Sequence, residues 1–271
     1  MSFNVKTLAA VGALIGTLAL AGCDQKEKDP NHIKVGVIVG SEQQVAEVAA
    51  KVAKDKYGLD VELVTFNDYV LPNEALSKGD IDLNAFQHKP YLDQQIKDRG
   101  YKLVSVGSTF VYPIAGYSKK IKTLDELQNG AQVAIPNDPT NLGRSLLLLQ
   151  KVGLIKLKEG VGLLPTSLDV VENPKNLKLV ELEAPQLPRS LDDQQIALAV
   201  INTTYASQIN LTPAKDGIFV EDKNSPYVNL LVAREDNKDA ENVKKFVQAY
   251  QSDEVNDAAN KVFNGGAVKG W

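Results

Sequence analysis

Residues 137–144 (Asn-Asp-Pro-Thr-Asn-Leu-Gly-Arg) combine features that can hold an anion. Asp138 followed by Pro139 is typical of a helix N-terminus, and a predicted strand ends immediately before it. The first turn of a helix offers free N–H donors and a partial positive charge, both of which attract anions. Arg144 falls in the second turn, where its guanidinium can grip a carboxylate through two hydrogen bonds. The segment therefore predicts an anion subsite suited to a carboxylate.

Other polar and aromatic residues stand at or near the ends of predicted strands. In α/β sheets ligands bind beyond the carboxyl ends of the strands, so these residues are candidates for the same site. The candidates are Tyr69 after one strand, Phe86, His88 and Tyr91 around the end of the next, Asn202 at the end of a later strand, and Asn229 within a strand.

Each candidate also has an ordinary structural interpretation. Arg144 is more often a surface cation, His88 a loop histidine with satisfied hydrogen bonds, and Phe86 a core residue. Asn202 can be a turn former, whereas Asn229 is harder to explain because asparagine is depleted in apolar strands. Three further asparagines are interpreted as cap or turn residues: Asn73, Asn84 and Asn137. A functional site requires the candidates to act together, which spacing alone does not establish.

The scaffold that would position these residues is predicted from alternating strand and helix patterns. The first half contains buried apolar runs separated by amphipathic segments, and Ser41 with Gln44 resembles a capping box that opens the first helix. Predicted strands in this half are residues 32–39, 60–66, 81–86, 103–110 and 112–118, with helices beginning near Ser41, Pro72 and Tyr91.

The second half continues the alternation. Predicted strands are residues 132–136, 177–183, 196–202 and 227–234, and predicted helices begin near Thr123 or span 139–152, 187–193 and 237–263. Breaks near residues 113–118 and 220–227 divide the pattern into two α/β units. We expect one lobe from residues 32–114 plus 224–271 and a second from 115–223, with two crossings between them. The predicted fold class is α/β.

The N-terminus has the order of a bacterial lipoprotein signal. Lys6 precedes an apolar run that ends at Ala21 and is shorter than the roughly 20 residues of a spanning helix. Leu-Ala-Gly directly before Cys23 resembles the lipobox, in which the thiol is lipidated before cleavage. We therefore expect residues 1–22 to be a signal peptide and Cys23 to carry the lipid. A secreted protein with a free thiol is less favoured, because a lone cysteine is a liability in an oxidising compartment.

The residues after Cys23 indicate a tether and a location. Residues 23–31 are polar and charged, which favours a flexible tether. Asp24 resembles the signal that keeps enteric lipoproteins on the inner membrane, so we expect a lipid-anchored protein there that faces the periplasm.

Composition excludes several classes of function. After the signal, 29 basic and 34 acidic residues give a net charge of 29 − 34 = −5, without a basic patch for nucleic acid. One cysteine and two histidines make a structural zinc or iron–sulfur site very unfavourable. Gly-x-Ser-x-Gly, His-Glu-x-x-His and Walker-type motifs are all absent from the sequence. The sequence therefore predicts no enzyme and no cofactor.

Several segments together resemble the NlpA-type lipoproteins. They are residues 66–76, 84–92, 135–146 and 225–229, of which Phe-Gln-His-Lys-Pro-Tyr and Pro-Asn-Asp-Pro-Thr-Asn are the most specific. The resemblance covers essentially the whole chain and extends to methionine-binding members of the family. It implies a type II periplasmic-binding-protein fold, in which two lobes close on a small ligand. It also implies methionine as the ligand, with the L form favoured and D-methionine or derivatives accepted. The implied partners are an ABC importer's membrane permease and its cytoplasmic ATPase.

The resemblance also implies roles for the candidates. Arg144 would pair with the ligand carboxylate, and Asn202 and Asn229 would hold its amino and carboxylate ends. The thioether chain would lie among Tyr69, Phe86, His88 and Tyr91, with Asn141 as a weaker candidate. Alternatives are a receptor for another amino-acid-like ligand, a lipid-anchored hydrolase, or an envelope scaffold.

Overall fold

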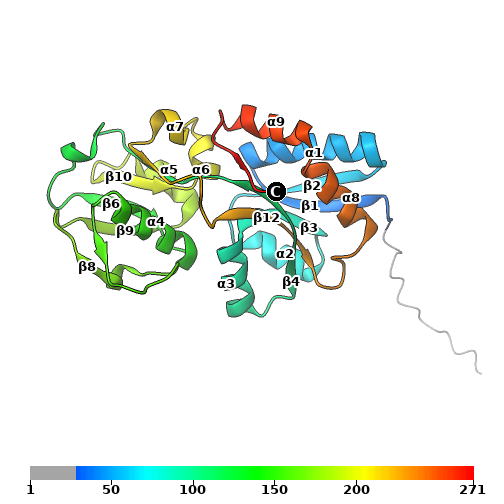
Figure 1. Ribbon diagram of the computed structural model, residues 1–271, viewed down its shortest axis with the longest axis horizontal. Helices are drawn as coiled ribbons and strands as arrows, with labels where there is room; N and C mark the ends of the chain where they lie inside the picture. The colour runs from blue at the N-terminus through cyan, green and yellow to red at the C-terminus, as the bar shows by residue number, and fades with distance from the viewer. Residues whose placement is uncertain (1–28) are drawn as a thin grey trace, which may run out of the picture.

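Residues 29–271 are described by a computed structural model, in which helices flank two mixed β-sheets (Figure 1). The predicted signal peptide and Cys23 lie outside the described residues. Along the part of the chain that is described, no helix has the length and apolar character needed to span a membrane.

The larger sheet is built mostly from the first part of the chain. Its strands, in spatial order, are β13 (Val268–Lys269), β4 (Leu103–Val111), β12 (Val228–Arg234), β3 (Leu83–His88), β1 (His32–Ile38) and β2 (Asp60–Phe66). β1 runs parallel to both of its neighbours, and β12 runs antiparallel to β3 and β4. The parallel strands place their carboxyl ends, including His88, at one edge of the sheet.

Side-chain alternation explains how helices cover both faces of this sheet. In β12, Leu231 and Ala233 face one core, whereas Leu230 and Val232 face the other. The first core packs against three helices: α1 (Ser41–Tyr57), α8 (Glu241–Tyr250) and α9 (Asp253–Val262). The second packs against α2 (Leu71–Lys78) and α3 (Lys89–Arg99). The inner strands β1, β3 and β12 are therefore covered on both faces.

The smaller sheet is built from the middle of the chain. Its strands, in spatial order, are β11 (Phe219–Val220), β5 (Ala115–Tyr117), β10 (Ile196–Ile201), β6 (Gln132–Pro136) and β9 (Lys178–Leu182). α4 (Pro139–Lys151) covers one face, and α5 (Leu187–Ser190) and α6 (Thr203–Gln208) cover the other. A hairpin of β7 (Lys156–Leu157) and β8 (Val170–Glu172) and the short helix α7 (Pro213–Asp216) complete this half.

The two sheets are connected in the same way, by a strand that follows a crossing between the lobes. Each contains one strand that arrives from the other half of the chain and lies antiparallel between two others: β12 in the larger sheet and β5 in the smaller. The chain passes from β4 to β5 through residues 112–114 and from β11 to β12 through 221–227. Figure 1 shows the two halves side by side, joined by these segments. The molecule is thus a two-lobed α/β protein with two interlobe crossings.

Three local predictions differ from the structure. The capping box at Ser41 is wrong, because Ser41 is the first residue of α1 and Gly40, with φ 105°, holds the cap position without a side-chain bond. The helix start near Thr123 forms only a 3-10 turn at Leu124–Glu126. The predicted C-terminal helix is divided into α8 and α9, because Ser252 begins a second helix by accepting a hydrogen bond from the backbone N–H of Val255.

Candidate functional site

A cavity with about 340 Å³ of unoccupied space lies between the two lobes, at the carboxyl end of β3 and the N-terminal ends of α4 and α6. All eight residues predicted from the sequence line it together: Tyr69, Phe86, His88, Tyr91, Asn141, Arg144, Asn202 and Asn229. The structure therefore places residues up to 160 positions apart in sequence around one space (229 − 69 = 160).

Arg144 supplies a buried cation at one end of the cavity. Its side chain is only 3% exposed, so the interpretation as a surface cation is wrong. Nε donates to Glu221 Oε1 at 2.9 Å, and Nη2 donates to Glu221 Oε2 and, at 3.0 Å, to the Tyr112 carbonyl. The guanidinium also stacks over the Tyr227 ring, 4.4 Å from its centroid. These contacts leave Nη1 as the edge of the guanidinium that can meet a ligand.

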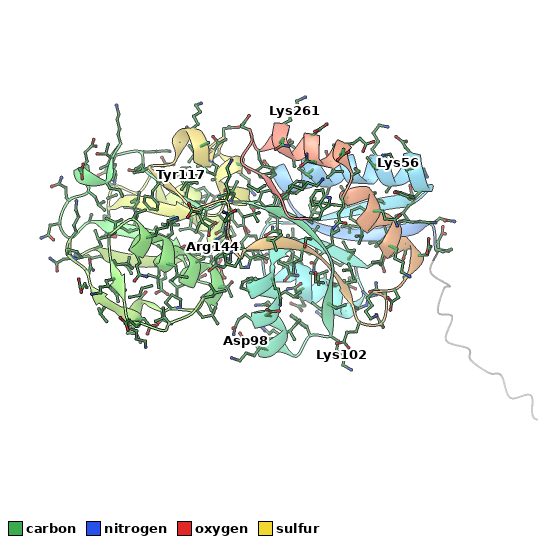
Figure 2. All side chains as sticks on the ribbon, viewed as in Figure 1. Lys56, Asp98, Lys102, Tyr117, Arg144 and Lys261 are labelled. Carbon is green, nitrogen blue, oxygen red and sulfur yellow. The ribbon has the colours of Figure 1, made fainter. Side chains whose placement is uncertain are left out.

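The contacts of Arg144 join both crossings between the lobes. Tyr112 lies on the first crossing and Glu221 on the second. Glu221 also accepts from the Ile114 N–H at 3.4 Å, and its own N–H donates to the Ile114 carbonyl at 2.9 Å. Figure 2 shows Arg144 near the centre of the molecule, at the border of the two lobes. A group bound to Arg144 would therefore contact the residue that ties the crossings together.

Asn141 links the lobes through hydrogen bonds of its side-chain amide. Its Nδ2 donates to both carboxylate oxygens of Asp138, at 3.1 and 2.9 Å. Its Oδ1 accepts from Asn202 Nδ2 at 2.8 Å and lies 3.2 Å from His88 Nε2. All polar atoms of this amide are thus engaged by protein, so Asn141 is better placed to orient its neighbours than to bind a ligand itself.

His88 is held neutral by its surroundings. It is the N-cap of α3, and its Nδ1 accepts from the Tyr91 N–H at 3.1 Å. Burial and the nearby Arg144 charge lower the pKa of His88 to about 3, so the imidazole is uncharged at neutral pH. Because Nδ1 accepts, the proton resides on Nε2, which then donates to Asn141. The interpretation as a histidine with satisfied hydrogen bonds holds, yet the same ring lines the cavity.

Two asparagines present amide oxygens to the cavity. Asn229 donates from Nδ2 to the Phe86 carbonyl at 3.0 Å, which leaves its Oδ1 as the free acceptor. Asn202 donates from Nδ2 to Asn141, and its Oδ1 is buried without a hydrogen-bond partner among the described residues. A buried acceptor without a partner is costly, and such a group in a cavity marks a place for a donor.

The opposite end of the cavity is aromatic. Tyr69, Phe86 and Tyr91 contact one another with ring centroids 5.8–6.1 Å apart. The Tyr91 hydroxyl donates to the Tyr69 carbonyl at 2.8 Å, which fixes the ring. Tyr69 also meets Tyr205 of the other lobe, with centroids 5.0 Å apart. An apolar ligand chain would be enclosed by rings here.

Next to these aromatic residues, buried side-chain amides form a hydrogen-bond network that the sequence interpretation missed. Asn73 and Asn84 were predicted to be cap or turn residues, and this is wrong because Asn73 lies within α2 and Asn84 within β3, where both are fully buried. Asn73 exchanges two hydrogen bonds with Gln87, at 2.8 and 2.6 Å, and Asn84 Nδ2 donates to Asn73 Oδ1 at 2.9 Å. The network fastens the start of α2 to β3, and Gln87 also lines the cavity.

The remaining lining residues were also missed. Thr203 and Thr204 follow Asn202 directly, so the strand-end rule that selected Asn202 contains the signal for them. Tyr112 lies just before the predicted break at the first crossing. Glu221 and Glu42 hydrogen-bond to the lining residues Arg144 and Thr204. No sequence pattern around either glutamate indicated this role. Among the described residues no group of His, Cys, Asp or Glu is arranged to hold a metal ion.

Comparison with known proteins identifies the family. The profile of the NlpA lipoproteins matches residues 33–271. The chain belongs to the NlpA lipoprotein family. It is 90% identical, over all 271 residues and the full length of both chains, to the D-methionine-binding lipoprotein MetQ of Escherichia coli (strain K12). The same protein of Salmonella typhimurium is also 90% identical over the same length.

Solved structures of related proteins share the fold of this NlpA lipoprotein. The crystal structure of the methionine-binding protein MetQ is 92% identical with a TM-score of 0.89, covering 90% of this chain and 99% of that one. A nutrient-binding protein from Burkholderia cenocepacia, solved bound to methionine, is 53% identical with a TM-score of 0.86. The match covers 88% of this chain and all of that one. The NlpA lipoprotein is therefore a two-lobed substrate-binding protein and not an enzyme.

Proposed function

We propose that this lipoprotein binds methionine in the interlobe cavity and delivers it to the membrane permease of an ABC importer, whose cytoplasmic ATPase drives uptake. The observation that carries the proposal is an interlobe cavity with a buried guanidinium and free amide oxygens at one side and aromatic rings at the other. The names of the close relatives, and of the related structure bound to methionine, support the same ligand.

The polar groups match the two charges of an amino acid. A zwitterion loses its water shell on burial, so both charges need hydrogen bonds in the cavity. Arg144 would donate from Nη1 to the carboxylate. Asn202 and Asn229 would accept from the ammonium group through Oδ1, because Nδ2 of each amide donates to a protein oxygen and leaves Oδ1 as the acceptor toward the cavity.

The aromatic end matches a thioether chain. Sulfur beside aromatic rings gains about 0.3–1.5 kcal/mol, and Tyr69, Phe86 and Tyr91 supply such rings. The tyrosine hydroxyls are uncharged there, since burial raises the pKa of Tyr91 far above its ordinary value. A charged ligand side chain would find no counter-charge among these rings.

The lobes and the anchor complete the proposed mechanism. We assign residues 32–114 plus 224–271 to one lobe and 115–223 to the other, which close on the ligand about the two crossings. The lipid on Cys23 would hold the protein at the inner membrane, facing the periplasm, with residues 23–31 as the tether. Closure would sequester methionine until the closed form docks on the permease.

The identity of the ligand can be tested directly. The full-length protein is purified in detergent and denatured, and any released small molecule is identified by mass spectrometry. Methionine near one molecule per chain is the expected result, and calorimetry with L- and D-methionine then measures the preference. Release of a different amino acid would overturn the ligand but retain the receptor class. An empty protein that gives no heat with either form would favour the scaffold alternative.

Two variants test the polar contacts. Arg144→Ala and Asn229→Ala are each expected to weaken methionine binding at least tenfold, equivalent to about 1.4 kcal/mol. Arg99→Ala, which removes an exposed arginine at the end of α3, is the matched control and should bind normally. Normal affinity in a folded Arg144 or Asn229 variant would remove that residue from the site.

A further inference from the structure

A directed chain of hydrogen bonds begins at Asp138 and ends in the cavity. Asp138 is the N-cap of α4 and accepts from the Asn141 N–H at 3.0 Å, as a cap residue should. It also accepts from the Asn141 side-chain Nδ2 through both oxygens. This second contact is not needed to cap the helix, and it fixes which way the Asn141 amide faces.

The direction of every later bond follows from the first. A carboxylate only accepts hydrogen bonds, so Asn141 must present Nδ2 to Asp138 and Oδ1 to the other side. Asn202 can then meet Asn141 only as a donor, through Nδ2 at 2.8 Å. Its Oδ1 is therefore left as an acceptor that lines the cavity without a partner.

His88 reaches the same arrangement independently. The Tyr91 N–H donates to its Nδ1, which places the ring proton on Nε2. Nε2 lies 3.2 Å from Asn141 Oδ1, where only a donor fits. Two separate constraints therefore agree on the orientation of one amide that connects the lobes.

We propose that Asp138 is a positioning residue for the ligand's ammonium group: through Asn141 it fixes Asn202 with its carbonyl oxygen toward the cavity. This inference rests on the proposed function and extends it to a residue that itself need not touch the ligand. Asp138→Asn is the sharpest perturbation because it keeps the shape and a capping oxygen. It also places an NH₂ group against Asn141 Nδ2, which favours a rotated Asn141 amide; that rotation gives up the His88 contact and lets Asn202 present a donor to the cavity.

The test compares two ligands that differ only in the ammonium group. Calorimetry on the full-length protein in detergent gives the affinities of L-methionine and of its deaminated analogue, methylthiobutanoate. The wild type should bind methionine more tightly than the analogue, because hydrogen bonds to a charged ammonium group are strong. We expect the ratio of the two affinities, methionine over methylthiobutanoate, to fall at least tenfold in Asp138→Asn. A purely structural loss would weaken both ligands equally and leave the ratio unchanged, which would overturn the proposal.

A matched control and a second measurement complete the test. Ser252→Ala removes the N-cap of α9, away from the cavity, and should leave the ratio unchanged. The chain has only two histidines, so nitrogen NMR of the wild type can determine the tautomer of His88 directly. A proton on Nε2 supports the proposed series of hydrogen bonds, whereas a proton on Nδ1 would overturn the proposal even if the Asp138 variant does not fold. Failure of the wild type to bind methionine would instead refute the proposed function.

Discussion

Glu42 carries its carboxyl in the first turn of α1, where only 2% of the residue is exposed. It hydrogen-bonds to Thr204, which belongs to α6 of the other lobe and lines the cavity. The titratable groups near its carboxyl are four tyrosine hydroxyls, those of Tyr69, Tyr112, Tyr205 and Tyr250. Burial without a cationic partner raises the pKa of Glu42 to about 8, although the Thr204 hydrogen bond acts in the opposite direction.

This raised pKa makes stability depend on pH in a defined direction. Between pH 4.5 and about 8 the folded protein holds a proton on Glu42 that the unfolded chain releases. The contribution of protonated Glu42 to the free energy of unfolding is therefore fully present below the pKa of the unfolded state. It is lost as pH rises through the pKa of the folded state. At about 1.4 kcal/mol per pKa unit, the loss over this window approaches about 5 kcal/mol. Glu42→Gln keeps the shape and a partner for Thr204 but cannot ionise, so it should remove this loss.

The assay is urea unfolding of the full-length protein in detergent at a series of pH values from 4.5 to 8, followed by the fluorescence of Trp271, the single tryptophan. We expect the stability of Glu42→Gln relative to wild type to rise with pH by several kcal/mol. The difference between proteins isolates Glu42, because all other titrating groups are shared. Glu47 is exposed on the same helix, and Glu47→Gln is the matched control: its stability relative to wild type should not change with pH. A difference for Glu42→Gln that does not change with pH would refute the reasoning.

Three further variants test other parts of the structure. Gly143→Ala would place a Cβ 2.4 Å from the Leu163 carbonyl oxygen, and we expect a loss of about 1–3 kcal/mol in urea unfolding; an unchanged midpoint would contradict the close packing of α4. Asn84→Ala removes hydrogen bonds to two neighbouring buried amides and should cost about 1–3 kcal/mol, measured in the same way. Cys23→Ala should abolish incorporation of labelled palmitate and membrane association in cell fractionation, and retention of the label would place the lipid elsewhere.

Local patterns in the sequence predicted local structure well. The cap at Asp138, the helix that follows it and the strand before it depend on neighbouring residues, and the structure has them at Pro139–Lys151 and Gln132–Pro136. The positions of candidate residues at strand ends also follow from local signals, because a strand end is visible in the sequence. All eight predicted candidates therefore line the cavity, although their individual roles stay predictions.

Pairings between distant residues were not predictable in the same way. Arg144 meets Glu221 across 77 positions, and Glu42 meets Thr204 across 162. Neither acidic residue stands in a pattern that distinguishes it from a surface carboxylate, since its burial depends on how the two lobes meet. Asn84 was misassigned for the same reason, because its partner Asn73 lies on another element, α2. The breaks in the strand and helix pattern predicted two units, and the resemblance to a family implied that they close on a ligand, but neither predicted which side chains meet between the lobes.

The ion pair of Arg144 also bears on how a neutral ligand would be selected. Glu221 already balances the guanidinium charge, and His88 is neutral, so these groups together carry no net charge. Under the proposed function, a zwitterion adds equal and opposite charges and leaves the balance intact. A ligand with a second carboxylate or a cationic side chain would bury an unpaired charge against the aromatic wall, which costs several kcal/mol. Arg144 would thus supply directed N–H donors and not net attraction. Because it ties Tyr112 and Glu221 on the two crossings, the carboxylate that fits these donors would be bound at the point about which the lobes close.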